Sequence, residues 1–168
     1  MLLRASQPEA MPLYFAYGAN MSLEAMAGRC PRSKPLGLAR LARHRLAVMR
    51  EGYLTAMRDP RGAVHGVLWD LALADIPALD RYEGLPQGLY AKVAQPVIGP
   101  TGPRRALVYF GANAGPGTAR LNYLADIIAA ARAWPLPADA IATLEALLQS
   151  AAAQAIPSPR IARRDTGV

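Results

Sequence analysis

The segment LYFAYGANMS, Leu13 to Ser22, joins an apolar run directly to a Gly-Ala-Asn turn and then to a helix start. Its first five residues are aromatic or apolar, as in a buried strand. Ser22 is a suitable N-cap for a short helix that Gly28 and Pro31 would end. In such a turn, consecutive backbone N–H groups can point into one space and bind a carboxylate or phosphate. The alternative is a turn with a purely structural role.

Hydrophobic periodicity and turn residues predict the elements that follow this segment. We expect strands near 36–49, 63–71, 88–98 and 104–111, and helices near 75–83, 121–131 and 141–148. The order β-α-β-β-α-β-β-α-α lacks the alternation of a doubly wound fold. It predicts an α+β protein with a mixed, largely antiparallel sheet or small barrel and flanking helices. Loops expected at 51–62 and 84–88 would form the outer wall of any pocket.

The chain has 168 residues, of which 52% are hydrophobic, and this favours one domain with a proper core. We expect the domain at 12–150, an N-terminal extension at 1–11 and a flexible tail at 151–168, because periodicity is confined to the middle. No apolar stretch reaches the ~18 residues of a membrane span. The N-terminus is a poor signal peptide. These features predict a cytoplasmic protein without a membrane partner.

The cysteine content, the histidine content and the net charge limit which kinds of site the chain can hold. Cys30 is the single cysteine, so no intrachain disulfide or multi-thiolate metal site is possible, and a bystander is favoured over a nucleophile. His44 and His65 lie in different elements, and we expect no metal. The net charge of +7 comes from scattered arginines, with the densest late cluster at Arg160 to Asp165 in the expected tail. A solvated basic surface is favoured over nucleic-acid binding.

The segment LDRYEG, Leu79 to Gly84, places a carboxylate where helix stability would favour a cation. Glu83 falls at the end of the predicted helix, against the negative end of its dipole, and Asp80 lies one turn earlier. Both effects would raise the pKa of Glu83, which makes it a candidate general base. The alternative is an exposed glutamate paired with Arg81 or another arginine.

In this order and spacing the motifs resemble those of the γ-glutamylcyclotransferases, also described as the AIG2-like or BtrG-like group. YFAYGANM resembles a signature of YFAYGSNM type, VHGVLWDL a V-x-G-V-[VL]-[WY] strand, and LDRYEG an LDxxEG motif, with GLY shortly after. The resemblance extends from Leu13 to Leu148 and implies a small mixed β-barrel with flanking helices. It also implies a reaction without a cofactor, in which a γ-glutamyl amine or amino acid is cyclised to 5-oxoproline and the amine is released.

The resemblance assigns roles residue by residue. Glu83 would be the catalytic general acid and base, with a pKa moved toward neutrality. The substrate-binding residues would be Tyr17, Gly18, Ala19 and Asn20 in the loop, and Tyr90 and Tyr109 in the pocket wall. The hydroxyl groups of Tyr90 and Tyr109 would orient the substrate; the alternative for each is a half-buried core tyrosine. In the loop, backbone amides would hold the glutamyl carboxylate, Gly18 would allow close approach, and Asn20 would pin the loop and cap the next helix.

One departure from the signature concerns Ala19, which stands where the family usually has serine. Loss of a donating hydroxyl would cost about 1 kcal/mol of binding or transition-state stabilisation. The substrate class also stays open, because family members act on γ-glutamyl amino acids, γ-glutamylamines or a γ-glutamyl-protected antibiotic intermediate. The alternative to an enzyme is a weakly active or inactive module that binds a γ-glutamyl or carboxylate ligand. We expect a monomer or homodimer.

Overall fold

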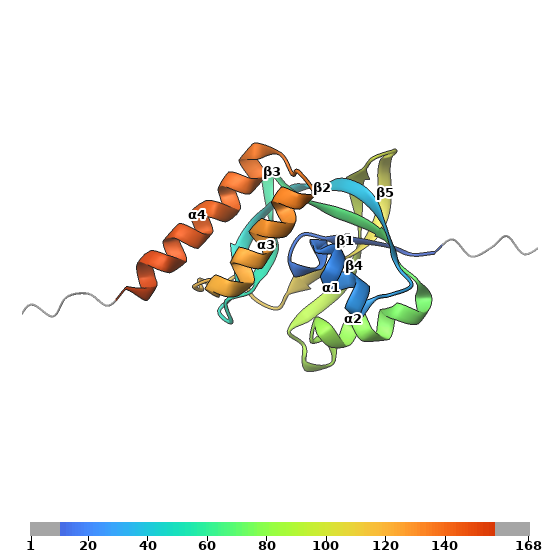
Figure 1. The fold of residues 1–168 in the computed structure, drawn as a ribbon, viewed down its shortest axis with the longest axis horizontal. Coiled ribbons are helices and arrows are strands. Elements are labelled where there is room, and N and C mark those ends of the chain that lie inside the picture. The colour runs from blue at the N-terminus through green and yellow to red at the C-terminus, as the bar shows by residue number, and fades with distance from the viewer. Residues whose placement is uncertain (1–10, 157–168) are drawn as a thin grey trace, which may run out of the picture.

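A computed structural model describes residues 11–156, and in this range the chain forms a closed five-stranded β-barrel (Figure 1). The strands are β1 (Leu13–Ala16), β2 (Lys34–Val48), β3 (Leu54–Asp70), β4 (Tyr90–Gly99) and β5 (Gly102–Gly111). The α-helices are α1 (Leu23–Arg29), α2 (Ile76–Tyr82), α3 (Leu121–Ala133) and α4 (Ala138–Ala155). Single 3-10 turns lie at η1 (Ala19–Met21), η2 (Leu73–Asp75) and η3 (Leu85–Gln87). The order of strands and α-helices is the predicted one.

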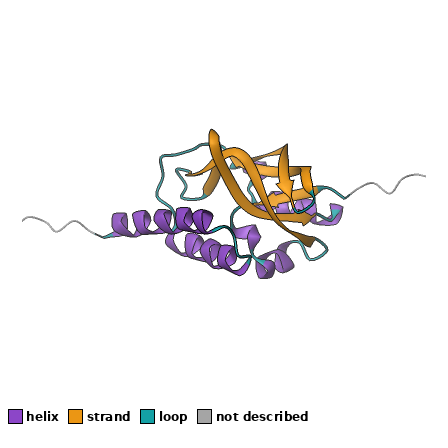
Figure 2. Cartoon of the chain, turned by 90° about the horizontal axis from the view of Figure 1, so that it is seen from above, coloured by secondary structure: helices purple, strands orange, loops and turns teal. Residues whose placement is uncertain are grey.

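The strands follow the order β1-β3-β2-β4-β5 around the barrel. Four neighbouring pairs are antiparallel, and the barrel closes through a parallel contact between β1 and β5, where Tyr14 pairs with Leu107. Figure 2 shows α3 and α4 running beside each other along one side of the strands. The prediction of an α+β fold with a mixed, mainly antiparallel barrel and flanking helices is therefore confirmed.

Strand β1 lies at the centre of the core. All four of its residues are buried, which explains why its sequence is apolar without alternation. Gly66 on β3 allows the close approach of β1, because a Cβ built there would lie 2.1 Å from the carbonyl oxygen of Ala16. Leu124 and Ile127 of α3 are fully buried against this core. The strand and the helix together hold the loop that follows β1.

The expected loop at 51–62 is wrong for most of its length, because β3 begins at Leu54. Ala42 pairs with Ala63 and His44 with Arg58, so that the Asp-Pro-Arg-Gly segment at 59–62 lies in a bulge opposite Arg43. Arg43 has a positive φ of 60° at this point. The composition of the segment is typical of a turn, but its neighbours pair with β2 on both sides, and this long-range pairing keeps the strand continuous.

Helix α4 continues through Ala155, past the expected domain boundary at residue 150. Ala151 is 3% exposed, so this last turn and a half still contributes to packing. The rest of the expected tail and nearly all of the expected N-terminal extension lie outside the described residues. Within residues 11–156, no helix combines the length and apolar character needed to cross a membrane.

Candidate active site

All seven residues proposed for the site line one cavity of about 150 Å³, although they come from four separate parts of the chain. The loop after β1 supplies Tyr17, Gly18, Ala19 and Asn20; the end of α2 supplies Glu83; β4 and β5 supply Tyr90 and Tyr109. A wider groove between α1 and α3 adjoins the cavity and shares Ala19, Tyr82 and Tyr123 with it.

The loop after β1 offers unused backbone donors. The N–H groups of Gly18, Ala19 and Asn20 make no hydrogen bond to any residue in the range 11–156, whereas the next two amides donate to the carbonyls of Gly18 and Ala19. Gly18 has a φ of −125°, and a Cβ there would meet Tyr123 Oη at an ordinary 3.5 Å. The packing of the protein itself therefore does not require glycine at this position, and three adjacent N–H groups without a partner in this range belong to residues that line the cavity.

The prediction that Asn20 caps the following helix is wrong. Ser22 is the N-cap of α1, and its side chain accepts from the N–H of Ala25 at 3.2 Å. The Asn20 side chain is 2% exposed, and its Nδ2 donates to Tyr14 Oη and to Glu83 Oε1, each at 3.1 Å. Asn20 therefore connects the loop to the carboxyl group rather than to the helix.

Glu83 is the C-cap of α2, with its backbone N–H donating to the carbonyl of Leu79 at 3.0 Å. Gly84 follows with a φ of +65°, the left-handed conformation that a helix end of this kind requires and that glycine adopts without strain. The chain thereby turns away and leaves the Glu83 side chain facing the cavity. Besides Asn20, the Tyr14 hydroxyl donates to Oε1 at a long 3.5 Å.

Burial raises the pKa of Glu83 to about 7. The positive charge of Arg29 and the hydrogen bonds from Tyr14 and Asn20 act in the opposite direction and limit the rise. The predicted direction of the pKa change agrees with this, but Asp80 is not its cause. Near neutral pH the carboxyl group of Glu83 can thus exist in both protonation states, as a general acid and base requires.

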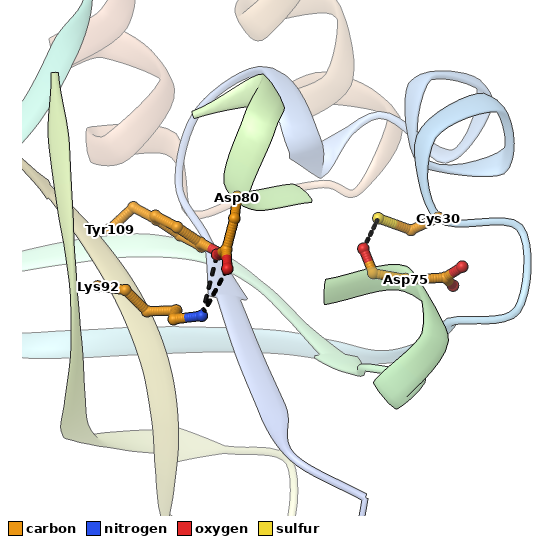
Figure 3. A network of polar contacts seen from close by, with 5 residues as sticks. All are labelled: Cys30, Asp75, Asp80, Lys92 and Tyr109. Atoms are coloured by element: carbon orange, nitrogen blue, oxygen red, sulfur yellow. Dashed lines mark hydrogen bonds and ion pairs between the residues drawn. The ribbon is translucent and has the colours of Figure 1, made fainter. Parts of the chain in front are cut away.

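Asp80 is engaged elsewhere, as Figure 3 shows. Lys92 Nζ lies 3.0 and 2.9 Å from its two carboxylate oxygens, and the Tyr109 hydroxyl donates to Oδ1 at 2.5 Å. The negative charge of Asp80 is therefore balanced by Lys92 on β4. This network joins α2 to β4 and β5 and fixes the Tyr109 ring in the cavity wall.

The hydroxyl protons of the three proposed tyrosines already have acceptors. Tyr17 donates to the carbonyl of Tyr109 at 2.6 Å, and Tyr90 donates to the carbonyl of Leu54 at 2.5 Å. Tyr109 donates to Asp80 as described above. These rings shape the wall, but none has a free proton for a substrate.

Sequence reasoning missed Tyr123 on α3. Its hydroxyl accepts from the N–H of Leu54 at 3.1 Å, while its own proton has no acceptor among residues 11–156. It also missed Tyr14, although this residue begins the YFAYGANM motif, and Arg29 at the end of α1. No local pattern singles out Tyr123 or Arg29, because the position of Tyr123 in the cavity wall and of Arg29 in the adjoining groove depends on how the helices pack.

Cys30 is the C-cap residue of α1 and does not line the cavity. It is 1% exposed, and its Sγ lies 4.0 Å from the carbonyl oxygen of Asp75 (Figure 3). Burial raises the pKa of the thiol to about 11, which is opposite to what a reactive thiolate needs. The geometry is that of a core residue.

The fold and the site define a class of small β-barrel protein with one polar cavity, in which loop amides without a partner among residues 11–156 lie together with a carboxyl group whose pKa burial raises to about 7. The chain belongs to the gamma-glutamyl cyclotransferase, AIG2-like family, whose sequence profile matches residues 14–128. The resemblance noted in the sequence is thereby confirmed.

Curated relatives include gamma-glutamylcyclotransferases from Bos taurus and Homo sapiens. The bovine protein is 30% identical over 101 residues, which cover 54% of this chain and 53% of that protein. The human protein is 30% identical over 91 residues, which cover 48% of each. The chain spans about half the length of the curated relatives it matches.

Solved structures extend the similarity over most of the fold. A gamma-glutamyl cyclotransferase structure superposes with a TM-score of 0.74 at 25% identity, covering 80% of this chain and 86% of that one. The crystal structure of a protein from Homo sapiens gives a TM-score of 0.75 at 26% identity, covering 82% and 88%. The barrel with its flanking helices is thus the shared feature.

Proposed function

We propose that the protein is a γ-glutamylcyclotransferase that converts a γ-glutamyl amine or γ-glutamyl amino acid into 5-oxoproline and releases the amine, with Glu83 as general acid and base. The observation that carries this proposal is that one cavity is lined both by Glu83, whose pKa burial raises to about 7, and by three loop residues whose N–H groups have no partner among the described residues. Family membership supports the same conclusion.

The proposed chemistry needs mainly proton transfer and a folded substrate. The Glu83 carboxylate takes a proton from the α-ammonium group, and the free amine attacks the side-chain carbonyl carbon to close a five-membered ring. The bond to the leaving nitrogen then breaks as Glu83 returns its proton to that nitrogen, and the extra proton of the ring nitrogen passes to the released amine, which departs as an ammonium ion. Because the two reacting groups belong to one molecule, the tether already brings them together, and no cofactor is required.

The loop donors suit the negative charges of this reaction. The N–H groups of Gly18, Ala19 and Asn20 would hold the α-carboxylate or the oxyanion that forms at the attacked carbonyl. Tyr123 would add a hydroxyl donor close to Gly18, since its Oη would lie 3.5 Å from a Cβ at that position. A cavity of about 150 Å³ is known to hold one small ring, which supports a glutamyl head inside and a leaving group in the adjoining groove.

The reaction is tested by incubating the protein with γ-glutamyl dipeptides and γ-glutamylamines and measuring 5-oxoproline. We expect turnover of at least one substrate, and loss of about a hundredfold or more in the Glu83→Gln variant. Glu145→Gln is the matched control, because Glu145 lies on α4, outside both the cavity and the adjoining groove. Equal turnover by Glu83→Gln would remove Glu83 from the mechanism.

A second candidate, a module that binds a γ-glutamyl ligand without turnover, is favoured by one observation: Ala19 lines the cavity and has no hydroxyl group to offer a substrate. It predicts a rise in melting temperature with γ-glutamyl compounds while no 5-oxoproline forms. Product formation by the unmodified chain would exclude it.

A further inference from the structure

We propose that Arg29 is a positioning residue for this site: it holds the Asn20 amide in the orientation that hydrogen-bonds Glu83, and it keeps Glu83 able to act as a base near neutral pH. The inference rests on the proposed function for its catalytic meaning. The contacts that Arg29 makes with Asn20 and Tyr82 are present in the protein without substrate and do not depend on that function.

The Arg29 guanidinium is held from two sides. Nη1 donates to Asn20 Oδ1 at 2.7 Å, a short distance for a charged donor. The guanidinium carbon lies 3.5 Å from the centre of the Tyr82 ring, so that the cation stacks on the ring face. Arg29 therefore connects the end of α1 to both η1 and the last residue of α2, which directly precedes Glu83.

This contact determines which way the buried Asn20 amide points. An amide oxygen only accepts and an amide nitrogen only donates. With the oxygen bound by Arg29, the NH₂ group faces Tyr14 Oη and Glu83 Oε1. A flipped amide would set its oxygen against the Glu83 carboxylate and its NH₂ group against the guanidinium, and both contacts would be repulsive. Arg29 thus orients Glu83 through Asn20.

The charge of Arg29 acts on Glu83 as well. Burial raises the pKa of this carboxyl group, and the Arg29 charge is the largest of the effects that lower it. Within residues 11–156, the other titratable groups that interact electrostatically with Glu83 are neutral tyrosines: Tyr14, Tyr17, Tyr82, Tyr90, Tyr109 and Tyr123. None of them can replace a cation. Without Arg29, the carboxyl group would stay protonated to higher pH and would be a poorer base at pH 7.

A purely structural role is the alternative. Arg29 is the basic residue in the last turn of α1, where a cation favours the helix dipole, and its stacking on Tyr82 adds contact area. Such a role would change the melting temperature when Arg29 is replaced, but it would not move the titration of Glu83.

The experiment follows the Glu83 carboxyl group by ¹³C NMR across pH in the full chain, with Glu83→Gln to assign the signal. The variants are Arg29→Met, which removes the charge and the donor, and Arg29→Lys, which keeps the charge. Arg81→Met is the matched control, because Arg81 is an exposed cation on α2 two residues before Glu83. The pH profile of kcat/KM is measured on the same set.

We expect the Glu83 midpoint to rise by about one pH unit in Arg29→Met, the lower end for loss of a nearby opposite charge. The rise should be smaller in Arg29→Lys and absent in Arg81→Met. The acidic limb of kcat/KM should move with the midpoint, so that activity falls about tenfold at acidic pH and little at alkaline pH.

An unmoved midpoint in a folded Arg29→Met variant would overturn the proposal, whatever its melting temperature. Should Arg29→Met fail to fold, Arg29→Gln, which retains an amide donor without the charge, is judged by the same criterion. The titration needs no substrate, so its outcome is separate from that of the proposed function. A midpoint that moves in a chain that forms no 5-oxoproline would refute only the proposed function.

Discussion

Replacing Glu83 with glutamine should stabilise the folded protein at alkaline pH, because it removes a carboxyl group that burial makes difficult to ionise. In the fold, the pKa of Glu83 is about 7, against 4.5 for an ordinary glutamate. The folded protein therefore binds this proton more tightly than the unfolded chain does. Well below pH 4.5 both states carry the proton, so Glu83 does not lower the free energy of unfolding.

The free energy of unfolding falls as the pH rises from 4.5 to 7, because only the unfolded chain releases the proton in this range, and the loss is complete above pH 7. The unfolded chain has then lost the proton, whereas the folded chain must hold a charge in a half-buried site. A pKa difference of about 2.5 corresponds to about 3 kcal/mol of unfolding free energy at 1.36 kcal/mol per pKa unit. Glutamine has nearly the same shape and can still accept from Asn20 Nδ2, so the hydrogen bond in the cavity is preserved.

Thermal melts of both proteins near pH 4.5 and pH 8.5 measure this effect. We expect similar melting temperatures at the lower pH and a gain of roughly 10 °C for Glu83→Gln at the higher pH, from 2–4 °C per kcal/mol for a domain of this size. Glu24→Gln, which changes an exposed carboxylate, should not gain stability with rising pH. A difference between wild type and Glu83→Gln that is constant with pH, or a loss at pH 8.5, would refute the assignment of burial as the cause.

Three further substitutions probe the loop, the α2 network and the core. Ala19→Ser should raise kcat/KM for 5-oxoproline formation by up to about fivefold, which corresponds to about 1 kcal/mol from one added hydrogen bond. Unchanged kinetics would mean that the added hydroxyl group has no partner in the substrate. Asp80→Asn should lower the free energy of unfolding by about 1–3 kcal/mol in urea, because the half-buried Lys92 loses its counter-charge; Lys92→Met in the same background should recover part of the loss. Gly66→Ala should lower the free energy of unfolding in urea by more than about 1 kcal/mol, since the added Cβ would lie 2.1 Å from the carbonyl oxygen of Ala16. An unchanged free energy of unfolding would contradict the close approach of β1 and β3.

Local signals predicted the order of elements and several of their ends. Ser22 caps α1 as its position before the helix indicates, and Gly84 adopts the left-handed conformation expected after a helix end. The same kind of signal misplaced the start of β3, because Asp-Pro-Arg-Gly at 59–62 has the composition of a turn. Only pairing with β2, on both sides of the bulge, keeps these residues within a strand.

For the site, the ordered motifs were sufficient to predict the loop after β1 and Glu83, and the structure brings both to one cavity. The direction of the pKa change was also predictable, since the negative end of a helix dipole disfavours a charged carboxylate. The main cause of the change could not be predicted from the sequence. Burial and the charge of Arg29 depend on how α1, α2 and β1 pack, and the neighbouring Asp80 is instead paired with Lys92.

Local patterns and their order were thus enough to predict the barrel class, the family and the two segments that carry the candidate chemistry. Which polar groups remain without a partner depends on how the chain packs. Tyr90 and Tyr109 have acceptors for their protons, whereas Tyr123 and the amides of Gly18 to Asn20 have none among the described residues. Hydrogen-bond partners come from segments far apart in the chain, so packing alone selects the groups left to meet a ligand.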